Sequence, residues 1–231
     1  MFTSDPRAAR TDDVLITKSV QRAVYDRLRT DILRGHIAGG TRLQQSDLAR
    51  EYGVSITPVR EALRDLAAEG LVDFTTYSGA VAHQPTIEEL EQVYDIRACL
   101  IPLSVREGVA RITEDELTAI DRLIHEMAEP RSPEQWIESN RRLHNLFDEA
   151  SRNAHLTTIL RRLGDLSTMY VNISLAPDQG DRDADQEHRA LLEAYRARDE
   201  AAAVRLSLRH FGQTLQLTRA RLAAAAAKEV S

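Results

Sequence analysis

The chain has 231 residues, of which 42% are apolar and 5% aromatic, and its formal net charge is −6. This length predicts two domains, and the apolar content suffices for packed cores of mainly aliphatic side chains. The single cysteine, Cys99, excludes an internal disulfide, and the sequence shows no signal-peptide core and no apolar run of about 18 residues. We therefore expect a cytoplasmic protein that does not span a membrane.

The charge is unevenly distributed along the chain. Residues 18–65 carry nine Lys or Arg and six Asp or Glu, a net charge of +3. Because the whole chain has a net charge of −6, the residues outside this segment carry a net charge of −9. Phosphate contacts require local positive charge and not a basic protein as a whole. The positive charge of residues 18–65 is thus compatible with binding to a nucleic acid.

Three helices are expected in the first third of the chain. Residues 1–17 have little periodicity and are predicted to form a flexible N-terminal arm. Apolar residues that recur every four positions predict a first helix ending at Gly35: Val20, Val24, Leu28 and Ile32. A second helix is expected over residues 45–52, and a tight turn at Gly53 leads into a third.

The third helix carries the most informative residues. Ser55 and Thr57 are good N-cap residues, and Pro58 is tolerated only in a first helical turn. Val59, Ala62, Leu63 and Leu66 form an apolar stripe that leaves Arg60 on another face. A polar helix start with an arginine one turn in is typical of a recognition helix in a DNA major groove.

A β-hairpin is predicted directly after this helix. Gly70 is a plausible helix stop, and residues 71–74 and 80–82 are the expected strands on either side of a turn at Tyr77-Ser78-Gly79. Helix, helix-turn-helix and hairpin is the order of a winged helix. We therefore assign residues 18–85 to a winged-helix DNA-binding domain of three helices and a wing.

This domain resembles the DNA-binding domain of GntR-family transcriptional regulators. The segment Thr57-Pro58-Val59-Arg60-Glu61-Ala62-Leu63 matches that family's recognition-helix signature. The resemblance implies a homodimer that binds an inverted repeat in double-stranded DNA. It implies DNA contacts at seven positions: Ser46, Ser55, Ile56, Thr57, Arg60, Ser78 and Gly79. Ser46, Ile56 and Ser78 stand where many relatives have a basic residue, which predicts a weaker operator complex or a different operator sequence.

Residues 86–231 read as helix with short breaks. Thr86 is a good N-cap for the first of six expected helices, and Glu89 completes a capping-box pattern. The other five are expected to begin near Thr113, Ser132, Ala154, Asp185 and Glu200. Short loops between helices predict an antiparallel all-α bundle. We expect this second domain to dimerise the protein and to bind an effector.

Four polar residues lie on the apolar faces of these helices: Asn140, His144, His188 and His210. A buried polar group without a partner costs about 1–3 kcal/mol, so four of them on three helices need a common explanation. Neutral imidazoles are good ligands for Zn, Ni or similar ions, and a metal site supplies that explanation. Taken singly, each histidine is more simply explained as a core residue with a hydrogen-bonding partner.

The segment from Ile87 to Phe211 resembles the C-terminal ligand-binding domain, of FCD type, of the FadR subgroup of GntR regulators. The matching residues are Leu143-His144, residues 150–153, Glu187-His188 and His210. The resemblance implies one divalent metal ion per subunit, held by Asn140, His144, His188 and His210, with Asn140 in place of the usual aspartate. It also implies that Arg97 contacts a carboxylate effector; a salt bridge to a neighbouring helix is the alternative for Arg97.

Three functions remain to be weighed. The first is a homodimeric transcription factor, expected to be a repressor, that senses a small carboxylate at a metal site. The second is a DNA-binding regulator whose bundle only dimerises and whose histidines are structural. The third is an enzyme with a metal-activated water. We expect no enzyme, because no general base is found near the ligands and Glu187 is expected to point to another face than His188.

Overall fold

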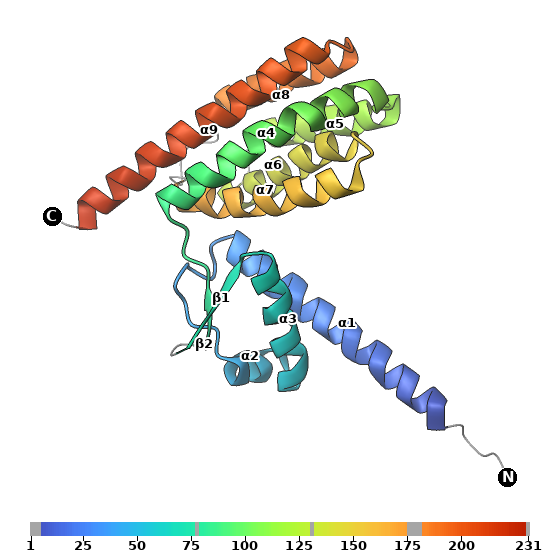
Figure 1. Ribbon diagram of the computed structural model, residues 1–231, viewed down its shortest axis with the longest axis vertical. Coiled ribbons are helices and arrows are strands. Elements are labelled where there is room, and N and C mark those ends of the chain that lie inside the picture. Colours follow the sequence, from blue (N-terminus) through green and yellow to red (C-terminus); the bar gives the residue numbers. More distant parts are fainter. Residues whose placement is uncertain (1–5, 77–78, 130–131, 175–181, 230–231) are drawn as a thin grey trace. The chain divides into compact units, whose positions relative to one another are not determined.

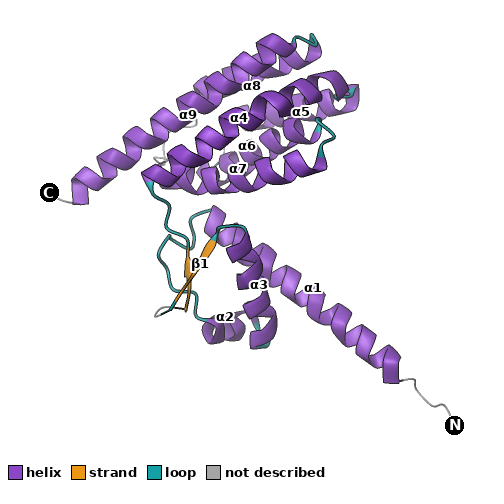
Figure 2. Ribbon diagram, in the orientation of Figure 1, coloured by secondary structure: helices purple, strands orange, loops and turns teal. Residues whose placement is uncertain are grey.

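The computed structural model describes residues 6–76, 79–129, 132–174 and 182–229, and it is mainly helical (Figure 1, Figure 2). The chain forms two compact units, Met1–Gln84 and Pro85–Ser231. The boundary between them lies one residue before the one expected from the sequence. The predicted fold class, a winged helix followed by an all-helical bundle, is confirmed. In the described residues, none of the helices combines the length and the apolar character needed to cross a membrane.

The N-terminal unit contains α1 (Pro6–Leu33), α2 (Gln45–Tyr52), α3 (Ile56–Ala68), β1 (Val72–Thr75) and β2 (Gly79–Ala82). The prediction of a flexible arm over residues 1–17 is wrong from Pro6 onward, because α1 is helical there. Adding a residue to an existing helix requires no apolar stripe, so periodicity alone did not reveal this extension. Proline is also well suited to the first position of a helix.

The core of this unit forms between α1 and α3, which pack against each other. It contains most of the predicted stripes: Val20 is half-buried, and the others are buried, namely Val24, Leu28, Ile32, Val59, Ala62, Leu63 and Leu66. Gly53 (φ +65°) caps α2 in the left-handed region, as the tight turn requires. β1 and β2 pair antiparallel with Val72 opposite Ala82, and Arg42 forms an additional bridge to Val81. A packed three-helix core therefore supports α3 from behind.

In the described part of the C-terminal unit, six helices form the bundle: α4 (Ile87–Arg111), α5 (Glu114–Ala128), α6 (Pro133–Glu149), α7 (Ala154–Ser174), α8 (Arg182–Arg196) and α9 (Glu200–Glu229). Thr113 and Ser132 complete capping boxes at α5 and α6, and the Thr86 hydroxyl accepts a hydrogen bond from the Glu89 amide at α4. The helix α4 packs against α7 and α9, α6 against α7, and α8 against α9. These pairings bring α4, α6, α8 and α9 together around polar side chains.

Candidate functional site

Three histidines from three helices converge inside the bundle. His144 on α6, His188 on α8 and His210 on α9 have ring centroids 4.8–5.4 Å apart. One ring nitrogen from each lies within 4.8 Å of the others. His188 and His210 are only 1% and 7% exposed, whereas His144 is half-buried because it lines a pocket. The predicted convergence of the three histidines therefore exists in the fold.

The donor atoms of this cluster suit a divalent ion. Among the residues that the structure describes, both ring nitrogens of His188 and the Oδ1 atom of Asn140 are buried without a hydrogen-bond partner. The Nε2 atoms of His144 and His210 are 3.3 Å apart. Two nitrogen ligands of one tetrahedral Zn²⁺, each at about 2.0–2.1 Å, are separated by about 3.3 Å. A bound cation would thus satisfy the Asn140 oxygen and one of the two His188 nitrogens.

Two of the three histidines, His144 and His188, are held in the neutral form that binds metals. Burial lowers the pKa of His188 to about 3, and the neighbouring His210 adds to the effect. Burial also lowers the pKa of His144 well below its usual range, helped by His210, His188 and Arg97. Removing a charged imidazole from water is costly, so the neutral ring is favoured. Lone pairs on these rings are therefore available at neutral pH.

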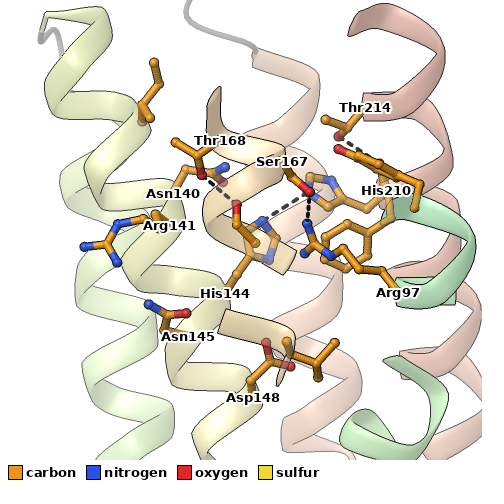
Figure 3. Close-up of a pocket in the computed structure, with 15 residues that line it drawn as sticks. Arg97, Asn140, Arg141, His144, Asn145, Asp148, Ser167, Thr168, His210 and Thr214 are labelled. Carbon is orange, nitrogen blue, oxygen red and sulfur yellow. Dashed lines mark hydrogen bonds between the residues drawn. The ribbon is translucent and has the colours of Figure 1, made fainter. Parts of the chain in front are cut away.

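A pocket opens next to the histidines (Figure 3). Asn140 lies one turn before His144 on α6 and lines the same pocket as His144 and His210. Arg97 reaches the pocket from α4 (Figure 3). The remaining polar lining is supplied by Arg141, Asn145, Asp148, Ser167, Thr168 and Thr214. The pocket thus joins the ligand cluster to a cationic side chain.

Arg97 is a buried cation that forms no salt bridge with a carboxylate in the described chain, although Asp148 and Asp165 attract it from a longer distance. It is 5% exposed, its Nη1 donates to the Ser167 hydroxyl at 2.8 Å, and its guanidinium lies 4.2 Å from the Phe211 ring centroid. Its Nε has no hydrogen-bond partner, and no salt bridge joins it to an acidic residue in the described chain. Burial lowers the pKa of Arg97, but a guanidinium stays charged in proteins. An anion in the pocket would compensate this charge, since the salt bridge considered for Arg97 is not formed.

The predicted DNA-contacting residues of α2, α3 and the wing lie on the surface. Ser46, Ser55, Thr57, Arg60 and Gly79 are exposed, and Ile56 is 50% exposed despite being apolar. Ser55 is the N-cap residue of α3 but its hydroxyl makes no capping bond. Ser78 lies outside the described residues.

Glu61 contacts two arginines on this surface. Its Oε1 lies 3.3 Å from Arg60 Nε and 3.0 Å from Arg64 Nη1. Exposed ion pairs of this kind contribute about 0–1 kcal/mol. Arg60 can therefore exchange Glu61 for an acceptor on DNA at little cost.

Two acidic residues near the histidines did not figure among the predicted site residues. The expectation that Glu187 points away from the site is wrong, because its Oε2 lies 2.7 Å from His210 Nδ1. Neighbouring residues on α8 do face different directions, but α9 packs alongside α8 and brings His210 to Glu187. Asp148 lines the pocket and follows His144 by four residues, a helical spacing that could have revealed it.

Comparison with known proteins agrees with this architecture. Residues 20–81 match the family of bacterial regulatory proteins named gntR, and residues 92–213 match the FCD domain. The HTH-type transcriptional regulator YdhC of Bacillus subtilis is 28% identical over 191 residues, covering 81% of this chain and 85% of YdhC. The HTH-type transcriptional repressor GlaR of Escherichia coli is 26% identical over 202 residues, covering 80% and 90% respectively. The solved structure of E. coli McbR/YncC has the same fold, with a TM-score of 0.76 at 21% identity over 86% of this chain and 96% of that one.

Proposed function

Because the chain belongs to the GntR family of bacterial transcriptional regulators and carries an FCD domain, we propose that a small carboxylate controls its binding to DNA through a metal site in the bundle. The family and the relatives are DNA-binding transcriptional regulators and not enzymes. GlaR is a repressor, and we extend repression to this chain. The observation that carries the proposal is the convergence of three imidazoles, together with the two buried ring nitrogens of His188, which have no hydrogen-bond partner in the described residues.

In this proposal His144, His188 and His210 hold one divalent ion such as Zn²⁺ or Ni²⁺, and Asn140 contributes its amide oxygen. The ion would supply a positive charge that coordinates a carboxylate oxygen. Arg97 binds the other end of the anion with the guanidinium edge that has no acidic partner. Asn140 is neutral, whereas the FCD domains that this segment resembles usually have an aspartate at this position. The ion and its ligands would therefore keep a net positive charge, which favours an anionic effector.

The position of Arg97 offers a route from effector to DNA. It lies on α4, the first helix after the wing, whereas the histidines lie on α6, α8 and α9. A ligand held from both sides would fix α4 against the rest of the bundle. An effector regulates only if it binds one arrangement of the two DNA-binding domains more tightly than another.

The DNA-binding part of the proposal is a homodimer on an inverted repeat. Each α3 would enter a major groove, with Arg60 and Ile56 toward the bases and Ser46, Ser55, Thr57, Ser78 and Gly79 near the backbone or the groove edge. Light scattering should give about twice the chain mass of 25.9 kDa. A monomeric mass with and without DNA would contradict it.

The metal site is tested by melting the full-length protein with a chelator and then with added Zn²⁺ or Ni²⁺. An ion at 100 times its Kd stabilises the folded state by about 2.7 kcal/mol, so the melting temperature should fall and recover. His144→Ala and His210→Ala should abolish this response, whereas His155→Ala, an exposed histidine on α7, should keep it. If neither the chelator nor the added ion changes the melting temperature of the wild-type protein, the histidines are structural and the bundle only dimerises.

A further inference from the structure

The imidazole of His210 lies between two groups. Its Nε2 faces His144 Nε2 at 3.3 Å, and its Nδ1 lies 2.7 Å from the Glu187 carboxylate. The Glu187 side chain is 16% exposed and that of His210 is 9% exposed, so water competes weakly for this contact. The other carboxylate oxygen of Glu187 has a more distant neighbour, Arg209 Nε at 3.9 Å, on an exposed side chain. The main contact of Glu187 is therefore with His210.

This contact determines which nitrogen of His210 carries the proton. A glutamate side chain is normally a carboxylate at neutral pH, and the Glu187 Oε2 lies at hydrogen-bonding distance, 2.7 Å, from His210 Nδ1. An ionised carboxylate can only accept hydrogen bonds, so Nδ1 must be the donor. A metal-binding imidazole carries one proton, so with that proton on Nδ1 the Nε2 of His210 would present its lone pair toward His144. That is the nitrogen that belongs to the cluster of possible ligands.

Glu187 also supplies charge that the ligands lack. Three neutral imidazoles and the amide of Asn140 contribute no negative charge to a divalent ion. The carboxylate lies behind His210 and not among the converging ligand atoms of His144, His188 and His210. A carboxylate hydrogen-bonded to the far nitrogen of a metal-binding histidine orients the ring and makes it a stronger ligand.

We propose that Glu187 is a positioning residue that holds His210 in its metal-binding tautomer and partly replaces the charge lost where Asn140 stands. The proposal rests on the metal site of the proposed function. It assigns a role to a residue that would not itself touch the ion or the effector.

The test is a titration of the metal-free full-length protein with Zn²⁺, and separately with Ni²⁺. Glu187→Gln keeps the size of the side chain and removes its charge, and it should weaken binding about 10- to 100-fold. Glu193→Gln on the same helix removes an exposed carboxylate that pairs with Arg196, and it should bind as the wild type does. Glu187→Asp retains the charge and should bind more tightly than Glu187→Gln, which separates loss of charge from loss of folding.

A second readout is the protonation of His210 in the metal-free protein, followed by ¹⁵N NMR of the ring nitrogens. The wild type should carry the proton on Nδ1, and Glu187→Ala should lose this preference. Equal metal affinity of wild type and Glu187→Gln would overturn the role of Glu187 while leaving the metal site intact. A wild type that binds neither ion would instead overturn the metal site of the proposed function, and with it this role.

Discussion

The two halves of the molecule place their functional side chains in opposite environments. In the winged helix, Arg60 and Ser55 project from α3 into solvent, and the buried stripe of Val59, Leu63 and Leu66 holds the helix from the other side. In the bundle, Arg97, His188 and His210 are themselves buried among apolar side chains. Substitutions of the exposed side chains on α3 should therefore change DNA binding without changing stability, whereas those of the buried polar side chains in the bundle should change both.

The strongest contrast is expected in acid. His188 has a native pKa of about 3 and that of His144 is also depressed, against 6.5 when exposed, so the unfolded chain binds protons that the native bundle does not. The contribution of these histidines to the free energy of unfolding is therefore present above pH 6.5. It is lost as the pH falls below that value, by about 1.4 kcal/mol per pH unit for each histidine. We expect the metal-free protein to unfold at progressively lower urea concentrations between pH 7 and pH 5.

The single tryptophan, Trp136, packs against the bundle core and reports this unfolding by fluorescence. His188→Leu should reduce the pH dependence, because it removes one of the two imidazoles whose pKa is depressed. A urea midpoint that is the same at pH 7 and pH 5 would contradict the burial of neutral histidines.

Arg60→Ala should show the opposite behaviour. Arg60 is exposed and its contact with Glu61 is weak, so the melting temperature should stay unchanged. Loss of a base contact should cost about 1–3 kcal/mol of operator binding at fixed salt. Arg161→Ala, which removes an exposed charge on α7, is the matched control for net charge. Wild-type affinity in Arg60→Ala, measured on an operator selected from random DNA, would show that α3 is not the recognition helix.

Much of this contrast is visible in the amino-acid sequence. The apolar stripe of α3, the start of α4 at Thr86 and the polar residues on the bundle's apolar faces follow from helical periodicity and cap chemistry. The helical residues of α1 before Val20 do not, because helix propagation leaves no periodic signal. The contact of Glu187 with His210 depends on how α8 and α9 pack, and periodicity within one helix cannot supply that information.

Asp148 offers a finer test of the buried site. Burial raises the pKa of its carboxyl from 3.8 to about 6, against a hydrogen bond from Ser104 that lowers it. The native state then binds a proton that the unfolded state releases, so this group stabilises the bundle as the pH falls from 6 to 4. Asp148→Asn should remove that compensation and steepen the acid sensitivity by about 1.4 kcal/mol per pH unit. Urea midpoints at pH 6 and pH 4.5 measure it, and parallel curves for variant and wild type would contradict the raised pKa.

The smallest expected effect concerns Ser55. A serine at an N-cap usually stabilises its helix by accepting a backbone hydrogen bond, and its loss costs about 0.5–2 kcal/mol. The Ser55 hydroxyl makes no such bond, so Ser55→Ala should leave the melting temperature nearly unchanged. The free hydroxyl lies at the positive end of α3, where a DNA phosphate would be favoured. Losing that contact should weaken binding by about 0.5–1.5 kcal/mol and equally for specific and random DNA, because a phosphate contact carries no sequence information. A drop in melting temperature of several degrees would mean that Ser55 acts on the helix, and a loss confined to specific DNA would place it on a base.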